Sequence, residues 1–193
     1  SSIQRASRCI LESKNIIHQI SFPKYLLPVA VVLVNLINFI PALLILIVFL
    51  IIFKVKLTLL IIFLPVVILI HTCLITGLSF MVSALQVIYR DVEYIIQVIL
   101  MALFFLTPGV YTLNELVSKA SPAFVKIYML NPLVGILNFY RAVFINGYLK
   151  GVPGEVNFFN TIINPLLWSV VLLFAGYAVF KKYEVRFFDH LHI

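Results

Sequence analysis

Long uncharged stretches dominate the pattern of hydrophobic and polar positions along the chain. Four of them, residues 25–53, 57–89, 94–114 and 156–180, contain no Asp, Glu, Lys or Arg. About 20 apolar residues suffice to cross the ~30 Å hydrocarbon layer of a bilayer, since a helix rises ~1.5 Å per residue. The pattern therefore predicts an all-α, polytopic membrane protein with four spans in one transmembrane domain, residues 1–193.

Charged residues fall in the short gaps between these stretches. Lys54 and Lys56 separate the first two spans, and "RDVE" at 90–93 separates the next two. Four spans put both chain ends on one side, which would carry eight Lys and Arg against six on the other. Because cytoplasmic loops are enriched in Lys and Arg, we expect segments 1–24 and 181–193 in the cytoplasm and the loop 115–155 outside.

The outer loop contains the run "NPLVGILNFYRAVF" at 131–144. The 14 residues between Lys126 and Arg141 carry no charge. They are too few to cross the bilayer and too apolar for an ordinary watery loop. Clusters of Pro and Gly on either side predict turns that separate short helices.

A short amphipathic helix is expected before the first span. Ser13 can cap it, Ile16 and Ile20 fall on one face, and Lys14 and His18 fall on the other. The proline at position 23 disfavours helix at the residue before it and ends the segment. The helix either has a function of its own at the membrane surface or is a simple anchor beside the span.

Composition supports the membrane assignment and removes several function classes. The chain is 63% hydrophobic and 11% charged, whereas soluble domains have about a quarter charged residues. The net charge of +7 suits anionic lipid rather than nucleic acid, because the basic residues flank apolar runs. Cys9 and Cys73 are too far apart in sequence to suggest a disulfide framework. No glycine-rich nucleotide motif is present, so any ATP would be bound by another subunit.

Polar residues inside the spans have two interpretations each. His71 lies in mid-span, where an ionisable group is a functional hypothesis by default, yet a neutral histidine can also bridge helices. Asn35 and Asn38 either join helices or contact a ligand. A stripe of small residues in the second span either allows close packing or lines a pore: Thr72, Thr76, Ser79 and Ser83. His190 and His192 do not share a helical face, which argues against a metal site.

The third span carries large side chains at helical spacing. These are Tyr94, Gln97, Met101, Phe104 and Phe105, followed by Tyr111. Such residues either face lipid or pack against other helices, or they line a route for sugars, which stack on aromatic rings. Arg90 and Asp91, just before this span, form either a structural ion pair or a contact for a cytoplasmic partner.

Five motifs in order resemble one family along nearly the whole chain. They are "FPKYLLP", "YRDVEY", "FFLTPGVY", "NPLVGILNFYRAVF" and "GYAVFKKYEVRFFD". Together they resemble the membrane subunit of type-2 ATP-binding-cassette exporters, in particular the permeases that export O-antigen, capsule or teichoic-acid polysaccharides. In that family each chain has six spans, two copies pair, and two copies of a separate ATPase dock. An amphipathic helix, a first span and most of a second precede the point that matches "SSIQRASRC".

The resemblance implies roles for named positions. Residues 14–21 correspond to the coupling helix on which the ATPases push, and 131–144 to re-entrant half-helices that close the outer mouth, their broken backbone covered by protein or water. The implied ATPase-coupling residues are Lys14, Asn15, Ile17, His18, Phe22, Pro23, Lys24, Arg90 and Asp91. The implied outer gate contains Asn131, Pro132, Phe139, Tyr140 and Arg141. The substrate conduit would contain Tyr94, Gln97, Met101, Phe104, Phe105 and Tyr111.

We therefore expect the non-enzymatic permease of an ATP-driven exporter for lipid-linked polysaccharide in a bacterial inner membrane. ATP and Mg would bind to the partner subunit, and this chain would need no cofactor or metal. Three alternatives remain: a type-2 permease for a drug or small lipid, a non-catalytic assembly protein, and a membrane enzyme built around His71.

Overall fold

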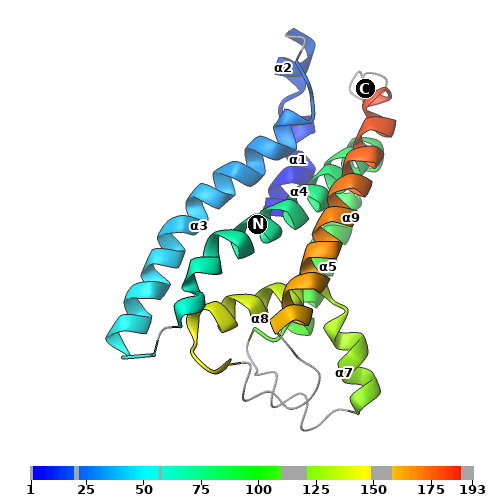
Figure 1. The fold of residues 1–193 in the computed structure, drawn as a ribbon. Coiled ribbons are helices and arrows are strands. Elements are labelled where there is room, and N and C mark those ends of the chain that lie inside the picture. Colours follow the sequence, from blue (N-terminus) through cyan, green and yellow to red (C-terminus); the bar gives the residue numbers. More distant parts are fainter. Residues whose placement is uncertain (1, 20–21, 57, 110–120, 149–157, 188–193) are drawn as a thin grey trace. The chain divides into compact units, whose positions relative to one another are not determined.

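The computed structural model describes residues 2–19, 22–56, 58–109, 121–148 and 158–187, and every regular element in these ranges is a helix (Figure 1). In chain order they are α1 (Ser2–Glu12), α2 (Lys14–Gln19), α3 (Leu26–Ile52), the 3-10 helix η1 (Leu59–Phe63), α4 (Leu64–Ile88), α5 (Val92–Leu106), α7 (Pro122–Met129), α8 (Pro132–Phe144) and α9 (Phe158–Glu184). The expected all-α polytopic membrane protein is confirmed.

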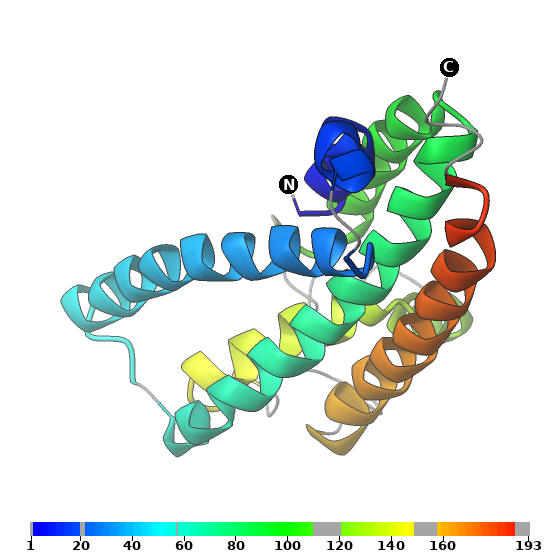
Figure 2. The same cartoon turned by 90° about the horizontal axis from the view of Figure 1, so that it is seen from above.

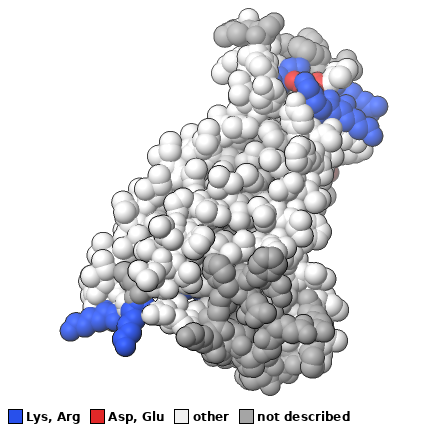
Figure 3. Space-filling view, viewed as in Figure 1, with Lys and Arg blue, Asp and Glu red and all other residues white. Residues whose placement is uncertain are grey.

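Three helices are long and apolar enough to cross a membrane. They are Leu26–Ile52, Leu59–Ile88 and Thr161–Glu184. In the space-filling view the surface over α3 carries no charged side chain, and Lys or Arg side chains appear beyond its end (Figure 3). The predicted third span is the 15-residue apolar helix α5 as far as Leu106, and its expected end at 110–114 lies outside the described residues.

The run at 131–144 forms one short helix, α8, within the loop where short helices separated by turns were predicted. Asn131 caps α8, its side-chain oxygen accepting a hydrogen bond from the Leu133 amide, and Pro132 occupies the first turn. Ser121 caps α7 in the same way. The segments Ala123–Met129 and Pro132–Phe144 meet at an 83° bend and together meet the length and hydropathy of one broken span or a re-entrant loop.

The chain divides into two compact units. The first contains Ser1–Ala42, Thr72–Met101 and Val170–Ile193, and the second contains Leu43–His71 and Ala102–Ser169. Each has its own core. In the first, α1, α2, α4 and α9 contribute to one buried cluster: Cys9, Ile10, Ile17, Phe80, Ala84, Val87 and Phe180, with Phe187 after α9. We call these eight residues the coupling cluster.

The core of the second unit is built around α8. Val134, Phe139 and Val143 have no exposed surface. Gly135 lies against the ring of Pro165 in α9, where a β-carbon would overlap the proline. The Asn164 side chain donates a hydrogen bond to the carbonyl of Met129 at the end of α7. Small and polar residues thus hold α7 and α8 to the start of α9.

Helix α1 was not expected from the sequence. The buried side of the helix consists of Ala6, Ser7, Cys9 and Ile10, of which only Ile10 is a large aliphatic residue. The exposed side carries charged residues: Arg5, Arg8 and Glu12. In both ribbon views α1 lies beside the end of α4 nearest to Ile88 (Figures 1 and 2). The segment before the first span is therefore two helices, and the first of them is part of the core.

Candidate functional site

Helix α2 occupies the position of the predicted coupling helix. It runs from Lys14 to Gln19, and residues 20–21 and the side chain of His18 lie outside the described part of the chain. Ile17 is 5% exposed and belongs to the coupling cluster, whereas Ile16 is 50% exposed. Asn15 also faces outward. One side of α2 is thus packed into the core and the other is open.

The coupling cluster connects α2 to two of the long helices. Phe80, Ala84 and Val87 follow one side of α4, and Phe180 lies in the last turns of α9. The rings of Phe80 and Phe180 have centroids 5.6 Å apart, and those of Phe180 and Phe187 are 5.4 Å apart. Interiors packed in this way transmit displacement because they have few voids to absorb it.

Phe22 and Lys24, which lie between α2 and α3, are close to the same cluster. Phe22 packs against it, and the Lys24 ammonium lies 5.7 Å from the centroid of the Phe187 ring. Partial burial lowers the pKa of Lys24. Pro23 is exposed and its carbonyl accepts a hydrogen bond from the Leu26 amide at 3.1 Å, which begins α3.

Arg90 and Asp91 form the exposed turn between α4 and α5. The Gln86 side chain donates to the Arg90 carbonyl at 2.8 Å, and the Asp91 carbonyl accepts from the amides of Tyr94 and Ile95. Within the described part of the chain, Arg90 and Asp91 make no ion pair with each other. The ion pair at this turn instead joins Arg8 of α1 to Glu93.

The predicted conduit residues of α5 are mostly on the surface. Tyr94, Met101, Phe104 and Phe105 are each more than 60% exposed, and Gln97 is half-buried, donating to the Glu93 carboxylate at 3.3 Å. Tyr111 lies outside the described residues. Exposed rings on an apolar helix suit contact with lipid, with another chain or with cargo, so the conduit role stays a prediction.

The predicted gate residues all belong to α8 and its N-terminal cap. Asn131 and Pro132 begin the helix, and residues 139–141 lie in its second half. Phe139 is fully buried, and the Tyr140 hydroxyl lies 3.3 Å from Nδ1 of His71 in α4, with the two rings nearly perpendicular. His71 therefore joins two helices, as the structural interpretation of this residue expected. No group of three or more His, Cys, Asp or Glu side chains within the described ranges could hold a metal ion.

Arg141 connects α8 to the end of α5. Its guanidinium donates to the carbonyls of Pro108 and Gly109, and also to the Tyr148 hydroxyl at 3.4 Å. That hydroxyl in turn donates to the Asn138 amide oxygen at 3.0 Å. The sequence did not single out Asn138 or Tyr148, because polar residues ten positions apart in an apolar loop have no characteristic spacing.

The polar stripe of α4 is involved in local packing. The Thr76 hydroxyl donates to the Thr72 carbonyl and the Ser83 hydroxyl to that of Phe80, while Ser79 is fully buried. In α3 the Asn35 side chain donates to the Val31 carbonyl, and Asn38 is exposed. His190 and His192 lie outside the described residues.

Comparison with known proteins identifies the family. Residues 2–145 match the family model described as "ABC-2 type transporter". This chain belongs to the ABC-2 type transporter family. The match covers α1 to α8 and includes all three predicted site regions. These are the coupling helix with the Arg90–Asp91 turn, the conduit residues and the gate residues of α8. This family assignment supports the expectation of a multi-pass transport protein over that of an enzyme.

Two curated relatives extend the similarity to almost the whole chain. The O-antigen export system permease protein RfbA of Myxococcus xanthus is 26% identical over 190 residues, which cover 98% of this chain and 70% of that protein. A protein of the same name from Klebsiella pneumoniae is 24% identical over 182 residues, or 94% of this chain and 66% of its own length. The ABC-2 chain described here thus matches about two thirds of each relative.

Proposed function

We propose that this chain is part of the permease of an ATP-driven exporter that moves a lipid-linked polysaccharide, of the O-antigen kind, across a bacterial inner membrane. The ABC-2 family match supports transport, and the names of the relatives, which are O-antigen export permeases, support O-antigen as the cargo. Two copies of the permease would pair, and two copies of a cytoplasmic subunit would bind ATP and Mg. Both ends of this chain would lie in the cytoplasm.

The burial of Ile17 in the coupling cluster is the observation on which the proposed mechanism depends. The ATPases would bind the open side of α2, at Lys14 and Asn15, and the exposed turn at Arg90 and Asp91. Closure of the ATPases on ATP would displace α2. Because Ile17 packs into one cluster with residues of α4 and α9, those long helices would move with it.

The second compact unit would contain the gate. Helix α4 is continuous from Leu64 to Ile88, so a displacement at Phe80 reaches His71, which contacts Tyr140 of α8. Arg141 holds the end of α5 through the carbonyls of Pro108 and Gly109. Movement of α4 would therefore shift α8, and α8 would shift α5. Sugar rings would slide along the aromatic side chains of α5.

A pull-down of the full-length protein from its own membranes, in mild detergent, tests this function. We expect a stoichiometric ATPase among the co-eluting proteins, identified by mass spectrometry and by ATP hydrolysis. Combined alanine substitution of Lys14, Asn15 and His18 should release it. Alanine at Lys54 and Lys56, predicted to lie on the opposite membrane face, is the matched control and should retain it.

Two results would contradict the proposal in different ways. If no ATPase co-elutes while the permease pair stays intact, the exporter function fails, and an assembly protein or an enzyme becomes the better explanation. If the ATPase is present but cells lacking the protein accumulate no long sugar chain inside, the cargo is wrong, and a drug or small lipid takes its place.

A further inference from the structure

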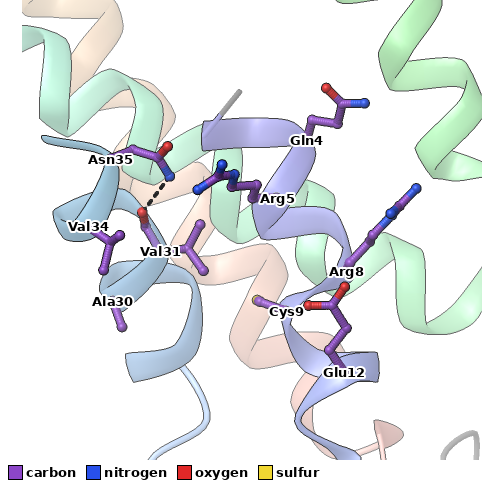
Figure 4. A pocket seen from close by; sticks show the side chains of 9 residues that line it. All are labelled: Gln4, Arg5, Arg8, Cys9, Glu12, Ala30, Val31, Val34 and Asn35. Atoms are coloured by element: carbon purple, nitrogen blue, oxygen red, sulfur yellow. Dashed lines mark hydrogen bonds between the residues drawn. The ribbon is translucent and has the colours of Figure 1, made fainter. Parts of the chain in front are cut away.

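A cleft of about 610 Å³ lies between α1 and the first turns of α3, within the first compact unit (Figure 4). It has one polar wall and one mainly apolar wall. The polar wall comes from α1 and carries three exposed charged residues: Arg5, Arg8 and Glu12. The opposite wall comes from α3 and contains Ala30, Val31 and Val34, with Asn35 at one end.

The charged residues that line the cleft are Arg5, Arg8 and Glu12. Arg8 is paired with Glu93 at the start of α5 and also interacts electrostatically with Glu12, so it lies between two carboxylates. Arg5 is exposed, and in the close view its guanidinium extends across the cleft toward Asn35 (Figure 4). Glu12 follows seven residues later, so it lies on the same face of α1, about 10 Å along the helix. A ligand with a negative and a positive group would match both.

The position of the cleft along α3 indicates a lipid. The span begins at Leu26, so residues 30–35 lie about 6–14 Å from its start, a depth that falls in the headgroup region and the adjoining acyl chains. Next to the cleft-lining residues, Leu33 and Ile37 of α3 are 50% and 65% exposed. An acyl chain leaving the cleft would therefore meet apolar side chains.

We propose that this cleft binds a bilayer phospholipid whose headgroup carries a phosphate and a primary amine. Arg5 donates hydrogen bonds to the phosphate, Glu12 accepts them from the ammonium, and the acyl chains lie along α3. A quaternary ammonium has no N–H to donate to Glu12, and a purely anionic headgroup would leave Glu12 beside another negative charge. Phosphatidylethanolamine has the required groups, whereas phosphatidylcholine and phosphatidylglycerol each lack one of these features.

Lipid retention by the full-length protein tests the site. The protein would be reconstituted in nanodiscs of phosphatidylcholine with one tenth phosphatidylethanolamine or phosphatidylglycerol, released, and analysed for bound lipid by native mass spectrometry. We expect phosphatidylethanolamine to be enriched over phosphatidylcholine. Arg5→Gln should lower its occupancy about fivefold, as for an exposed charge-assisted hydrogen bond. Glu12→Gln should remove the preference over phosphatidylcholine while leaving phosphate binding.

Two further variants separate this site from general attraction of lipid. Ala30→Phe fills the cleft without changing its charge and should abolish the enrichment. Arg186→Gln removes an exposed charge elsewhere in the same unit and should leave it unchanged. Equal retention of phosphatidylglycerol and phosphatidylethanolamine, or equal loss in Arg186→Gln and Arg5→Gln, would overturn the proposal. The measurement needs no ATPase, so it is independent of the exporter function.

Discussion

The backbone of Gly77 in α4 contacts the backbone of Gly176 in α9. A β-carbon added at Gly176 would overlap the Gly77 carbonyl, and one added at Gly77 would overlap the backbone at Leu172 and Leu173. The two spans therefore approach closely enough to leave no room for a side chain, in the way that small residues allow inside membranes. Both glycines belong to the first unit.

Substituting Gly176→Ala should push α4 and α9 apart. Backbone atoms cannot yield as a flexible side chain can, so we expect a loss of about 1–3 kcal/mol of folding free energy, typical of overpacked cores. Thermal unfolding in detergent, followed by size-exclusion chromatography, measures it. Gly109→Ala is the control, because a β-carbon there comes no closer than 3.9 Å to another atom. Equal melting temperatures for the two variants would disprove the close crossing.

Ile17→Ala should weaken the mechanical connection between α2 and the spans. Its side chain is buried in the coupling cluster, and truncating a buried isoleucine typically costs about 2–5 kcal/mol. We expect the ATPase still to bind, since Lys14 and Asn15 are unchanged, while export falls more than ATP hydrolysis. Ile62→Ala, which truncates an isoleucine of η1 that is 77% exposed and lies outside α2, should affect neither. Unimpaired export by Ile17→Ala would exclude this route of coupling.

The contact between His71 and Tyr140 should be measurable as a pairwise energy. The Tyr140 hydroxyl and His71 Nδ1 are 3.3 Å apart, and hydrogen bonds between helices in membranes average about 0.6 kcal/mol. A double-mutant cycle with Tyr140→Phe and His71→Gln, read by thermal unfolding, should give a coupling energy of that order. Additive effects of the two substitutions would mean that the pair does not interact. Normal export by His71→Ala would further argue against an enzyme at this residue.

The spans and α8 could be predicted from the sequence because their signals are local. Hydrophobic length alone predicts α3, α4 and α9, and Asn131 followed by Pro132 begins α8 as a cap followed by proline should. Helix α1 gave no comparable signal, since its buried side contains small residues and one isoleucine between charged positions. In a six-residue helix such as α2, periodicity cannot decide which isoleucine enters the core.

Contacts between residues that are far apart in the sequence could not be predicted. Arg141 was assigned to the gate by resemblance, but its carbonyl partners, Pro108 and Gly109, lie more than thirty residues earlier. Backbone acceptors have no sequence signature, because every residue has a carbonyl. The pairing of Arg8 with Glu93, rather than of Arg90 with Asp91, likewise depends on where α1 packs, and that helix was not predicted.

One experiment can decide whether the predicted conduit residues line a path for sugars or face lipid. Replacing Phe104, Phe105 and Tyr111 together with alanine should impair export while partner assembly stays intact, because sugars lose the ring faces on which they stack. Export is measured as surface polysaccharide, and assembly by pull-down. Phe174→Ala removes an aromatic side chain that is 69% exposed on α9 and should leave export unchanged. Normal export by the triple variant would remove these residues from the conduit and place α5 against lipid or a second copy of the chain.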